Sequence, residues 1–377
     1  MAVVLAVFLD LVGFGIVVPQ LPLAAARFTS SGLVIGAVVA TDSLLTFLLA
    51  PKWGRLSDRI GRRPVILLGL AGSAIAYTVF GMAGSLAVLF LARILSGSLG
   101  ATVNVAQAAL ADTTPPEQRS RAMGLIGAAF GLAFTVGPAL GGLASRLGEG
   151  APGLLAASIC LVNFLLASLL LRESRARRAQ DWGATIRVPR AALVVTFAAT
   201  LAFTTMYVIF QQFGIQVLGL TRAGISYAFT LVGLVSVLVQ GRVVRRLAPK
   251  LGELRLVSWG GGLMAAGLAL MPLLAAASLE GAARVAAIGL AVALLSAGFS
   301  LVGPCVAGFV SRSTPPNDQG RVLGTLQSIG SAARIVGPPV LGALADTGGF
   351  AAAFGLSALA GAAAGGVAAR WKATSGR

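Results

Sequence analysis

Long runs of apolar residues follow one another along almost the whole chain, separated by short stretches that carry charges or turn residues. Each run is about 20 residues long, which is the length that an α-helix needs to cross a bilayer core. Runs that contain Gly or Pro still predict helices, because such breaks are tolerated inside membrane bundles. The pattern predicts twelve membrane-spanning helices, at residues 2–22, 33–51, 65–83, 86–111, 122–144, 152–171, 191–212, 223–241, 256–275, 284–310, 322–345 and 350–369.

The first apolar run could also be a secretory signal peptide, since Ala24, Ala25 and Ala26 imitate a cleavage site. A signal peptide normally begins with basic residues, and none precede this run. Asp10 and Pro19 also interrupt it. We therefore interpret this segment as the first membrane helix.

The composition points to lipid as the solvent. Hydrophobic residues make up 57% of the 377 residues and charged residues only 11%, whereas a water-soluble chain needs about a quarter of its residues charged. A soluble enzyme is excluded, and no nucleophile–base pair or phosphate-binding loop suggests an enzyme of another kind. Both cysteines lie inside apolar runs, which argues against a structural disulfide. The chain has no histidine, so we expect no metal site with nitrogen and sulfur ligands and no cofactor.

The net charge of +17 could indicate a nucleic-acid partner, but the positions of the basic residues argue against one. With twelve spans, both termini and the even-numbered loops share one side, and nearly all Lys and Arg residues fall there. The opposite side has only Arg27, Arg146, Arg222 and Arg284. The positive-inside rule makes the basic side cytoplasmic. We expect a multi-pass protein of the bacterial inner membrane, with both termini in the cytoplasm.

The chain repeats itself with an offset of 200 residues. Thr114-Pro115-Pro116 recurs as Thr314-Pro315-Pro316, and the pair Gly137-Pro138 recurs as Gly337-Pro338. Such a repeat predicts two similar six-helix bundles with a cleft between them, as alternating access requires. The polar, basic segment in the middle suits a linker on the cytoplasmic side. The predicted division is 1–171 for the first bundle, 172–190 for the linker and 191–377 for the second bundle.

The loop after the second span reads Gly54-Arg-Leu-Ser-Asp58-Arg59-Ile-Gly61-Arg62-Arg63-Pro64. Its glycines allow a tight turn, and its Asp can face a helix N-terminus, where the dipole favours an anion. The spacing resembles the G-x-x-x-D-R-x-G-R-R signature of the major facilitator superfamily, with Pro64 in place of the last basic residue.

Three other segments are similar to members of that superfamily. Arg93 to Ala101 resembles its fourth-helix pattern R-x-x-x-G-x-x-G-A. The fifth span contains the G-P-x-x-G-G motif that is typical of its antiporters, at Gly137, Pro138, Gly141 and Gly142. The first span and the Ala111-Asp112 pair resemble the tetracycline/proton antiporters.

The resemblance implies an all-α membrane fold with twelve transmembrane helices in two pseudo-symmetric six-helix bundles. It also implies a conformational latch in which Asp58 contacts the start of the eleventh helix and Arg59 or Arg62 pairs with Asp112. The residues of this predicted latch are Gly54, Asp58, Arg59, Gly61, Arg62, Arg63 and Asp112.

Four ionisable residues lie inside predicted spans: Asp10, Asp42, Arg93 and Arg334. Charges at such positions are costly and mark functional sites by default. Asp42 lies near the middle of its span, where a carboxyl group can load a proton from one side and release it to the other. We expect Asp10 and Asp42 to carry protons and Arg93 to tune the proton affinity of these two acids. Alternatively, Asp10 is a helix-end residue and Arg93 a structural hydrogen-bond donor.

A few polar side chains among aromatic ones predict a cavity for a drug-sized amphiphile. The predicted cavity residues are Phe14, Asn104, Gln107, Phe134, Tyr207, Gln211, Gln327 and Arg334. Each of these also fits a role in packing, and Arg334 could bind either an anionic substrate group or a backbone carbonyl.

The function that these features favour is export of drug-like or tetracycline-like molecules in exchange for protons, with the proton gradient as the energy source. The chain lacks a histidine and has no acid inside spans 7–12, unlike the tetracycline antiporters, so a general drug or metabolite is an equal candidate. A proton-coupled nutrient symporter, a facilitator and a lipid flippase remain alternatives. The expected partners are an amphiphilic substrate, protons and the bilayer, with no nucleic acid, and the expected state is a monomer.

Overall fold

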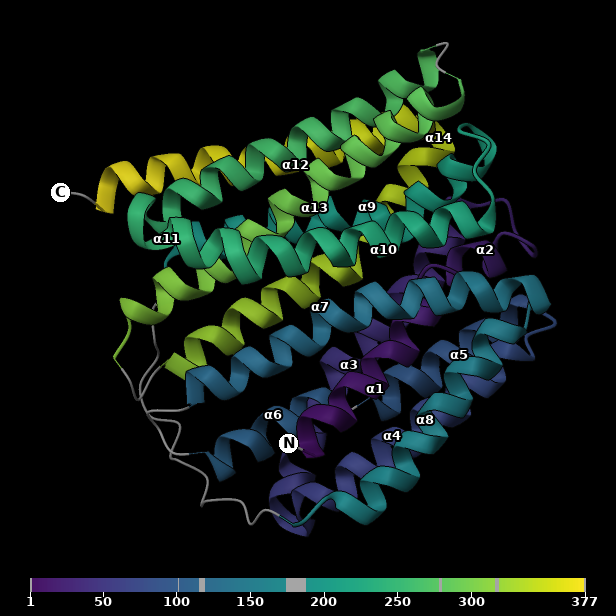
Figure 1. Cartoon of the computed structure of the whole chain (residues 1–377), viewed down its shortest axis with the longest axis vertical. Coiled ribbons are helices and arrows are strands. Elements are labelled where there is room, and N and C mark those ends of the chain that lie inside the picture. Colours follow the sequence, from purple (N-terminus) through teal and green to yellow (C-terminus); the bar gives the residue numbers. More distant parts are fainter. Residues whose placement is uncertain are drawn as a thin grey trace. The chain divides into compact units, whose positions relative to one another are not determined.

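The computed structural model describes residues 2–100, 102–114, 119–173, 188–277, 280–315 and 319–375. Most of the predicted linker, and the prolines Pro115, Pro116 and Pro316 of the repeated loop, lie outside these residues. The described part of the chain forms helices and turns without a β-strand (Figure 1). The predicted all-α architecture is therefore confirmed.

The helices follow the apolar runs closely. In the first part of the chain they are α1 (Ala2–Val17), α2 (Leu21–Ala25), α3 (Gly32–Ile60), α4 (Arg62–Gly81), α5 (Leu86–Leu99), α6 (Thr102–Thr113), α7 (Arg119–Ala144), the 3₁₀ turn η2 (Ser145–Leu147) and α8 (Ala151–Leu170). In the second part they are α9 (Arg190–Gln216), α10 (Arg222–Leu238), the π-helical η3 (Val239–Val244), α11 (Arg245–Leu251), α12 (Glu253–Ala276), α13 (Gly281–Arg312) and α14 (Gln319–Ser375).

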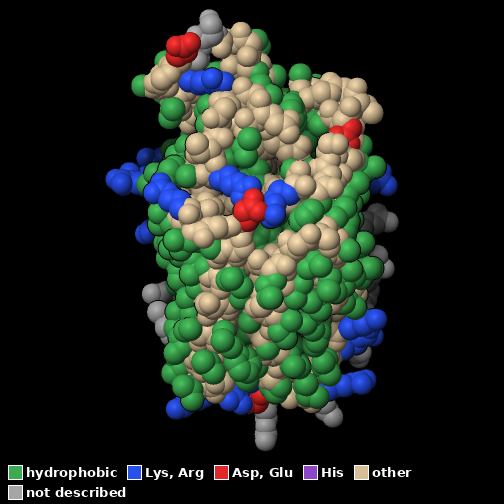
Figure 2. All heavy atoms as spheres, turned by 90° about the vertical axis from the view of Figure 1, so that its right-hand side faces the viewer, with side chains coloured by type: hydrophobic (Ala, Val, Ile, Leu, Met, Phe, Trp, Pro, Cys, Tyr) green, Lys and Arg blue, Asp and Glu red, His purple; other side chains and the backbone are tan. Residues whose placement is uncertain are grey.

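Ten helical segments among the described residues are long and apolar enough to cross a membrane. One of them, within α14, consists of two helices that meet at Gly349, whose φ of 75° breaks the helical path. α7 has 26 residues and covers the predicted span 122–144. Nine of the twelve predicted spans therefore fall on a single helical element, and the other three are each divided between two: 2–22 between α1 and α2, 86–111 between α5 and α6, and 223–241 between α10 and η3. The face in Figure 2 carries mostly hydrophobic side chains, with charged ones in a few small groups, as a surface in contact with lipid requires.

The chain divides into two compact units, each of which combines separate segments. Unit 1 consists of residues 1–30, 41–183 and 220–233, and unit 2 of residues 31–40, 184–219 and 234–377. Each unit has its own apolar interior. The bundle boundaries expected from the sequence stay a prediction.

The two units pack equivalent helices in the same way. In unit 1, α1 packs on α7, and α4 packs on both α5 and α8. In unit 2, α9 packs on α14, and α12 packs on both α13 and α14 (Figure 1). α7 and α14 carry the repeated Gly-Pro pair at the same place in each set. The repeat in the sequence thus corresponds to a repeat of helix pairs.

Each unit contains one cysteine. Cys160 lies on α8 and Cys305 on α13, and both are free thiols buried in their units.

Candidate functional site

An ion pair in unit 1 joins two of the charges that the sequence places inside the membrane. Nη2 of Arg93 on α5 lies 3.2 Å from Oδ2 of Asp42 on α3, and Ser96 donates a hydrogen bond to Oδ1 of Asp42 at 2.6 Å. The Arg93 side chain is 5% exposed and the Asp42 side chain 15%. The carboxylate therefore has a charged and a neutral donor in a site that is nearly shielded from solvent.

Glycine makes this approach of α5 to α3 possible. A Cβ atom on Gly97 would lie 2.6 Å from the backbone oxygen of Asp42, so no larger residue fits there without a shift. Thr46 donates a hydrogen bond to the carbonyl of Gly97, and Nε1 of Trp53 donates one to the carbonyl of Ser98 at 2.7 Å. The fourth-helix motif thus places Arg93 against Asp42 on α3.

Asp10 lies on α1, within electrostatic range of Asp42. The thiol sulfur of Cys160 is 4.0 Å from Oδ1 of Asp10. Asn163 on the same helix as the cysteine donates a hydrogen bond to the carbonyl of Ala6 at 2.8 Å, which fixes α1 against α8. Unit 1 therefore contains an ion pair between α3 and α5 and a second carboxyl group, that of Asp10, on α1.

Arg62 is the centre of the predicted latch region. Its Nε lies 3.0 Å from Oδ2 of Asp112, and its Nη1 lies 2.7 Å from Oδ1 of Asp58 and donates a hydrogen bond to Ser57. The arginine that pairs with Asp112 is thus Arg62, whereas Arg59 is exposed. Gly61 precedes it with a φ of 102°, a conformation that favours glycine.

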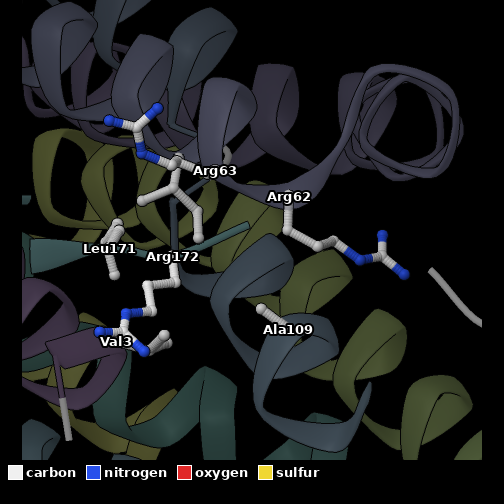
Figure 3. A pocket seen from close by; sticks show the side chains of 7 residues that line it. Val3, Arg62, Arg63, Ala109, Leu171 and Arg172 are labelled. Atoms are coloured by element: carbon white, nitrogen blue, oxygen red, sulfur yellow. The ribbon is translucent and has the colours of Figure 1, made fainter. Parts of the chain in front are cut away.

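Arg63 makes its hydrogen bonds on a different side of the same turn. Its Nη2 donates a hydrogen bond to the carbonyl of Ser168 at 2.7 Å, and Glu173 accepts hydrogen bonds from the backbone N–H groups of Arg62 and Arg63. A small pocket of about 40 Å³ lies beside these residues (Figure 3). Figure 3 shows that the guanidinium groups of Arg62, Arg63 and Arg172 point in different directions, so they do not converge on one anion.

The antiporter motif brings α7 onto α1. A Cβ atom on Gly137 would lie 2.9 Å from backbone atoms of Gly15, and one on Gly141 would lie 2.9 Å from the carbonyl oxygen of Ile16. Pro138 stands inside α7 between these contacts. Gly142, at the end of the motif, instead faces Ser226, whose Cβ would be 2.6 Å from an added Cβ. The motif is therefore a surface of small residues for close helix packing.

The predicted cavity residues divide equally between the units. Unit 1 holds Phe14 and Phe134, whose ring centroids are 6.0 Å apart in an edge-to-face arrangement, and the exposed amides Asn104 and Gln107 of α6. Unit 2 holds the other four. Tyr207 and Gln211 lie on α9, and Gln327 and Arg334 lie on α14.

Some residues of these clusters were not predicted. Ser96 lies one turn after Arg93 on α5, and this spacing was its only signal. Glu173 had no local signal. In unit 2, Asp346 accepts hydrogen bonds from the N–H groups of Gly32 at 2.7 Å and Leu33 at 3.1 Å and from the Ser31 hydroxyl. It thereby caps the N-terminus of α3 from a residue far away in the sequence.

A family model described as Major Facilitator Superfamily matches residues 3–338. The chain belongs to this superfamily. Its members are transporters, so the chain is a multi-pass membrane transporter and not an enzyme, as the sequence predicted.

Two relatives, and the solved structure of one of them, are similar to this chain. "Tetracycline resistance protein, class B" of Escherichia coli is 29% identical over 349 residues, which cover 88% of this chain and 84% of that protein. "Major facilitator superfamily domain-containing protein 10" of Homo sapiens is 34% identical over 348 residues, or 82% and 73%. The crystal structure of the human organic anion transporter MFSD10 (TETRAN) superposes with a TM-score of 0.74 at 25% identity, covering 97% and 98% of the two chains.

Proposed function

We propose that this transporter exports drug-like amphiphiles in exchange for protons, by alternating access across a bacterial inner membrane. The observation that carries the proposal is the cluster of Asp42, Arg93 and Ser96 between two membrane helices. A carboxyl group with few solvent contacts binds a proton when its guanidinium partner moves away, and loses it when the partner returns. Asp10, the other acid inside a predicted span of unit 1, would share this role.

Proton influx would drive the export. Each positive charge that moves inward gains about 2.3 kcal/mol per 100 mV of membrane potential. No bound cofactor is required, and a single chain with both units suffices. The relatives named tetracycline resistance protein and organic anion transporter support a drug-like substrate in general, with no nutrient implied by their names.

Two groups of side chains support the proposed orientation. Glu149 lies 2.6 Å from Arg27 and 3.0 Å from Arg222, two of the four basic residues assigned to the non-cytoplasmic side. Arg62, Asp112 and Glu173, which the sequence assigns to the opposite side, also lie together in unit 1. The proposed orientation places the C-terminus in the cytoplasm. A fluorescent protein that matures in the cytoplasm should therefore fluoresce when it is fused to the C-terminus. A reporter protein that matures only outside the cytoplasm should stay inactive at the same position.

The test of antiport is proton release when substrate binds. Purified protein in weakly buffered detergent would receive tetracycline and a panel of neutral, cationic and anionic amphiphiles, and both binding and pH change would be recorded. We expect release from the wild type, no release from Asp42→Asn, and normal release from Glu280→Gln. Glu280 is a matched control because it is an exposed acid before α13.

Two outcomes would reject the proposal. One is binding of several compounds by the wild type without any proton release. The other is a wild-type response in Asp42→Asn. In liposomes, substrate movement in the same direction as protons would favour the symporter instead.

A further inference from the structure

Arg334 has no role in the proton exchange proposed above. Apart from Arg284 at the edge of a span, it is the one formally charged residue within predicted spans 7–12, all of which the structure describes. It lies on α14 of unit 2, half-buried, and its Nη2 donates a hydrogen bond to the Ser331 hydroxyl at 2.9 Å. An arginine inside a membrane helix is costly and indicates a functional position.

A hydroxyl group of α9 lies on the same side of α14 as this guanidinium group. A Cβ atom on Gly330, one turn before Arg334, would lie 3.6 Å from Nη1 of Arg334 and 3.7 Å from the Thr200 hydroxyl. Tyr207 lies within electrostatic range of Arg334. Gly330 therefore lies between the guanidinium group of Arg334 and the Thr200 hydroxyl of α9, where a small residue fits. The cluster combines a planar cation with neutral donors, which is the chemistry that recognises a carboxylate or a similar anion.

Aromatic rings continue the same face of α9. The rings of Tyr207 and Phe203 meet edge to face, with centroids 5.5 Å apart, and Phe203 stacks on Phe299 with centroids 4.0 Å apart and planes at 6°. These residues form a set of packed aromatic rings on the same helix as Thr200. A flat aromatic body attached to an anionic group would match both parts.

An independent observation on α9 also points to a ligand. Gln211 is one turn after Tyr207, is fully buried, and neither its amide nitrogen nor its amide oxygen has a hydrogen-bond partner. A buried amide without partners costs free energy, and a native protein rarely keeps one without a reason. A polar group on a bound molecule would satisfy it.

We propose that unit 2 binds an aromatic substrate by its anionic group at Arg334, with Tyr207 and Gln211 as further contacts. This assignment rests on the proposed export function and specifies the charge class of the exported molecule. Arg334 is then a specificity-determining residue, and the carboxyl groups of unit 1 exchange the proton.

Three probes with one fluorophore test the charge preference. Dansylglycine is anionic, its methyl ester is neutral and dansylcadaverine is cationic. Their affinities for the purified full-length protein in detergent would be measured by fluorescence at equal pH and salt. We expect the wild type to bind dansylglycine about 10- to 100-fold more tightly than the ester, as a charged hydrogen bond predicts. Arg334→Gln should abolish this preference.

Two further variants keep the test decisive. Arg334→Lys retains the charge but not the planar fork, and should keep part of the preference. Arg284→Gln, a matched control at the end of a helix of the same unit, should keep all of it, and size-exclusion elution checks that each variant is folded. Equal binding of acid and ester by the wild type, tighter binding of the cation, binding of none of the probes, or an unchanged preference in Arg334→Gln would each overturn the proposal.

The measurement separates this inference from the export function, because binding in detergent needs no proton gradient. A preference that depends on Arg334, in a protein that releases no protons, would keep the anion site and reject antiport. Proton release without a charge preference would keep antiport and reject the anion site.

Discussion

The two units share a set of helix pairs but differ in the charges they enclose. Unit 1 places Asp10, Asp42 and Arg93 among α1, α3 and α5. Unit 2 has Arg334 on α14, where it donates a hydrogen bond to the Ser331 hydroxyl. Within the predicted spans, apart from Arg284 at the edge of one, a repeated scaffold thus carries two acids and an arginine in one copy and Arg334 in the other. The two proposals assign proton exchange to unit 1 and recognition of the substrate's charge to unit 2. Three further experiments test the differences between the two units.

The largest effect is expected from Arg93→Leu. This change leaves the carboxylate of Asp42 nearly buried without its cation, and loss of one partner of a buried pair costs about 3–5 kcal/mol. The midpoint of thermal unfolding in detergent should fall strongly. The double variant with Asp42→Asn should be more stable than Arg93→Leu alone, because the neutral amide removes the unpaired charge.

The matched control for this experiment is Arg245→Leu, which removes an exposed arginine of α11. We expect a change within about 0.5 kcal/mol, as for other surface positions. If Arg93→Leu were as stable as this control, the ion pair would contribute nothing to the stability of the protein. Unit 1 would then differ from unit 2 in its charged residues but not in a charge pair that stabilises it.

The intermediate effect concerns the repeated glycines. A Cβ atom on Gly137 would meet backbone atoms of Gly15 and Val12 at 2.9 Å, whereas one on Gly337 would first meet the Thr204 hydroxyl at 2.5 Å. Backbone cannot rotate away, but a hydroxyl can. Gly137→Ala should therefore lose about 1–3 kcal/mol, the usual cost of overpacking, and Gly337→Ala clearly less. Thermal unfolding of the two variants under identical conditions measures the difference.

Equal losses of stability in Gly137→Ala and Gly337→Ala would mean that the two units tolerate an added Cβ atom equally well, contrary to the local geometry. A larger loss at Gly337 would mean that the hydrogen bond from Thr204 to the carbonyl of Leu201 cannot be given up.

The smallest effect is expected at Asp346, where the carboxylate caps α3. Asp346→Ala should cost about 0.5–2 kcal/mol, as for loss of other helix caps, and Asp346→Asn less because its amide oxygen still accepts. Faster hydrogen exchange at the amides of Gly32 and Leu33 would identify the lost cap directly. Thr347→Ala, which alters the neighbouring residue, should leave that exchange unchanged, and a similar increase there would reject the cap as the cause.

The long helices were predictable because they span apolar runs of sufficient length that end at charged or turn residues, whereas the short helices α2, α6 and α11 were not predicted as separate elements. The division of α14 at Gly349 was visible as a short interruption, but the π-helical segment Val239–Val244 had no signal in the apolar pattern. A one-residue change in hydrogen-bond spacing hardly alters the spacing of apolar positions over a whole span.

The candidate site was predictable in part. Charge inside a span identified Asp42 and Arg93, and motif spacing identified the loop of Arg62, but only the structure selects Arg62 over Arg59 as the partner of Asp112. The Asp346 cap joins residues 314 positions apart. No local pattern encodes such a contact, because it depends on how two distant helices come together.

The two cysteines have a practical consequence for measuring motion. Cys160 and Cys305 are free but buried, one in each unit, so thiol reagents should react slowly with the native chain. Spin labels attached to new cysteines at Leu147 in unit 1 and Val285 in unit 2, which are 86% and 67% exposed, would then dominate the signal. Double electron–electron resonance between them, recorded with and without substrate at several pH values, would report the distance distribution of the transport cycle in an otherwise unmodified chain.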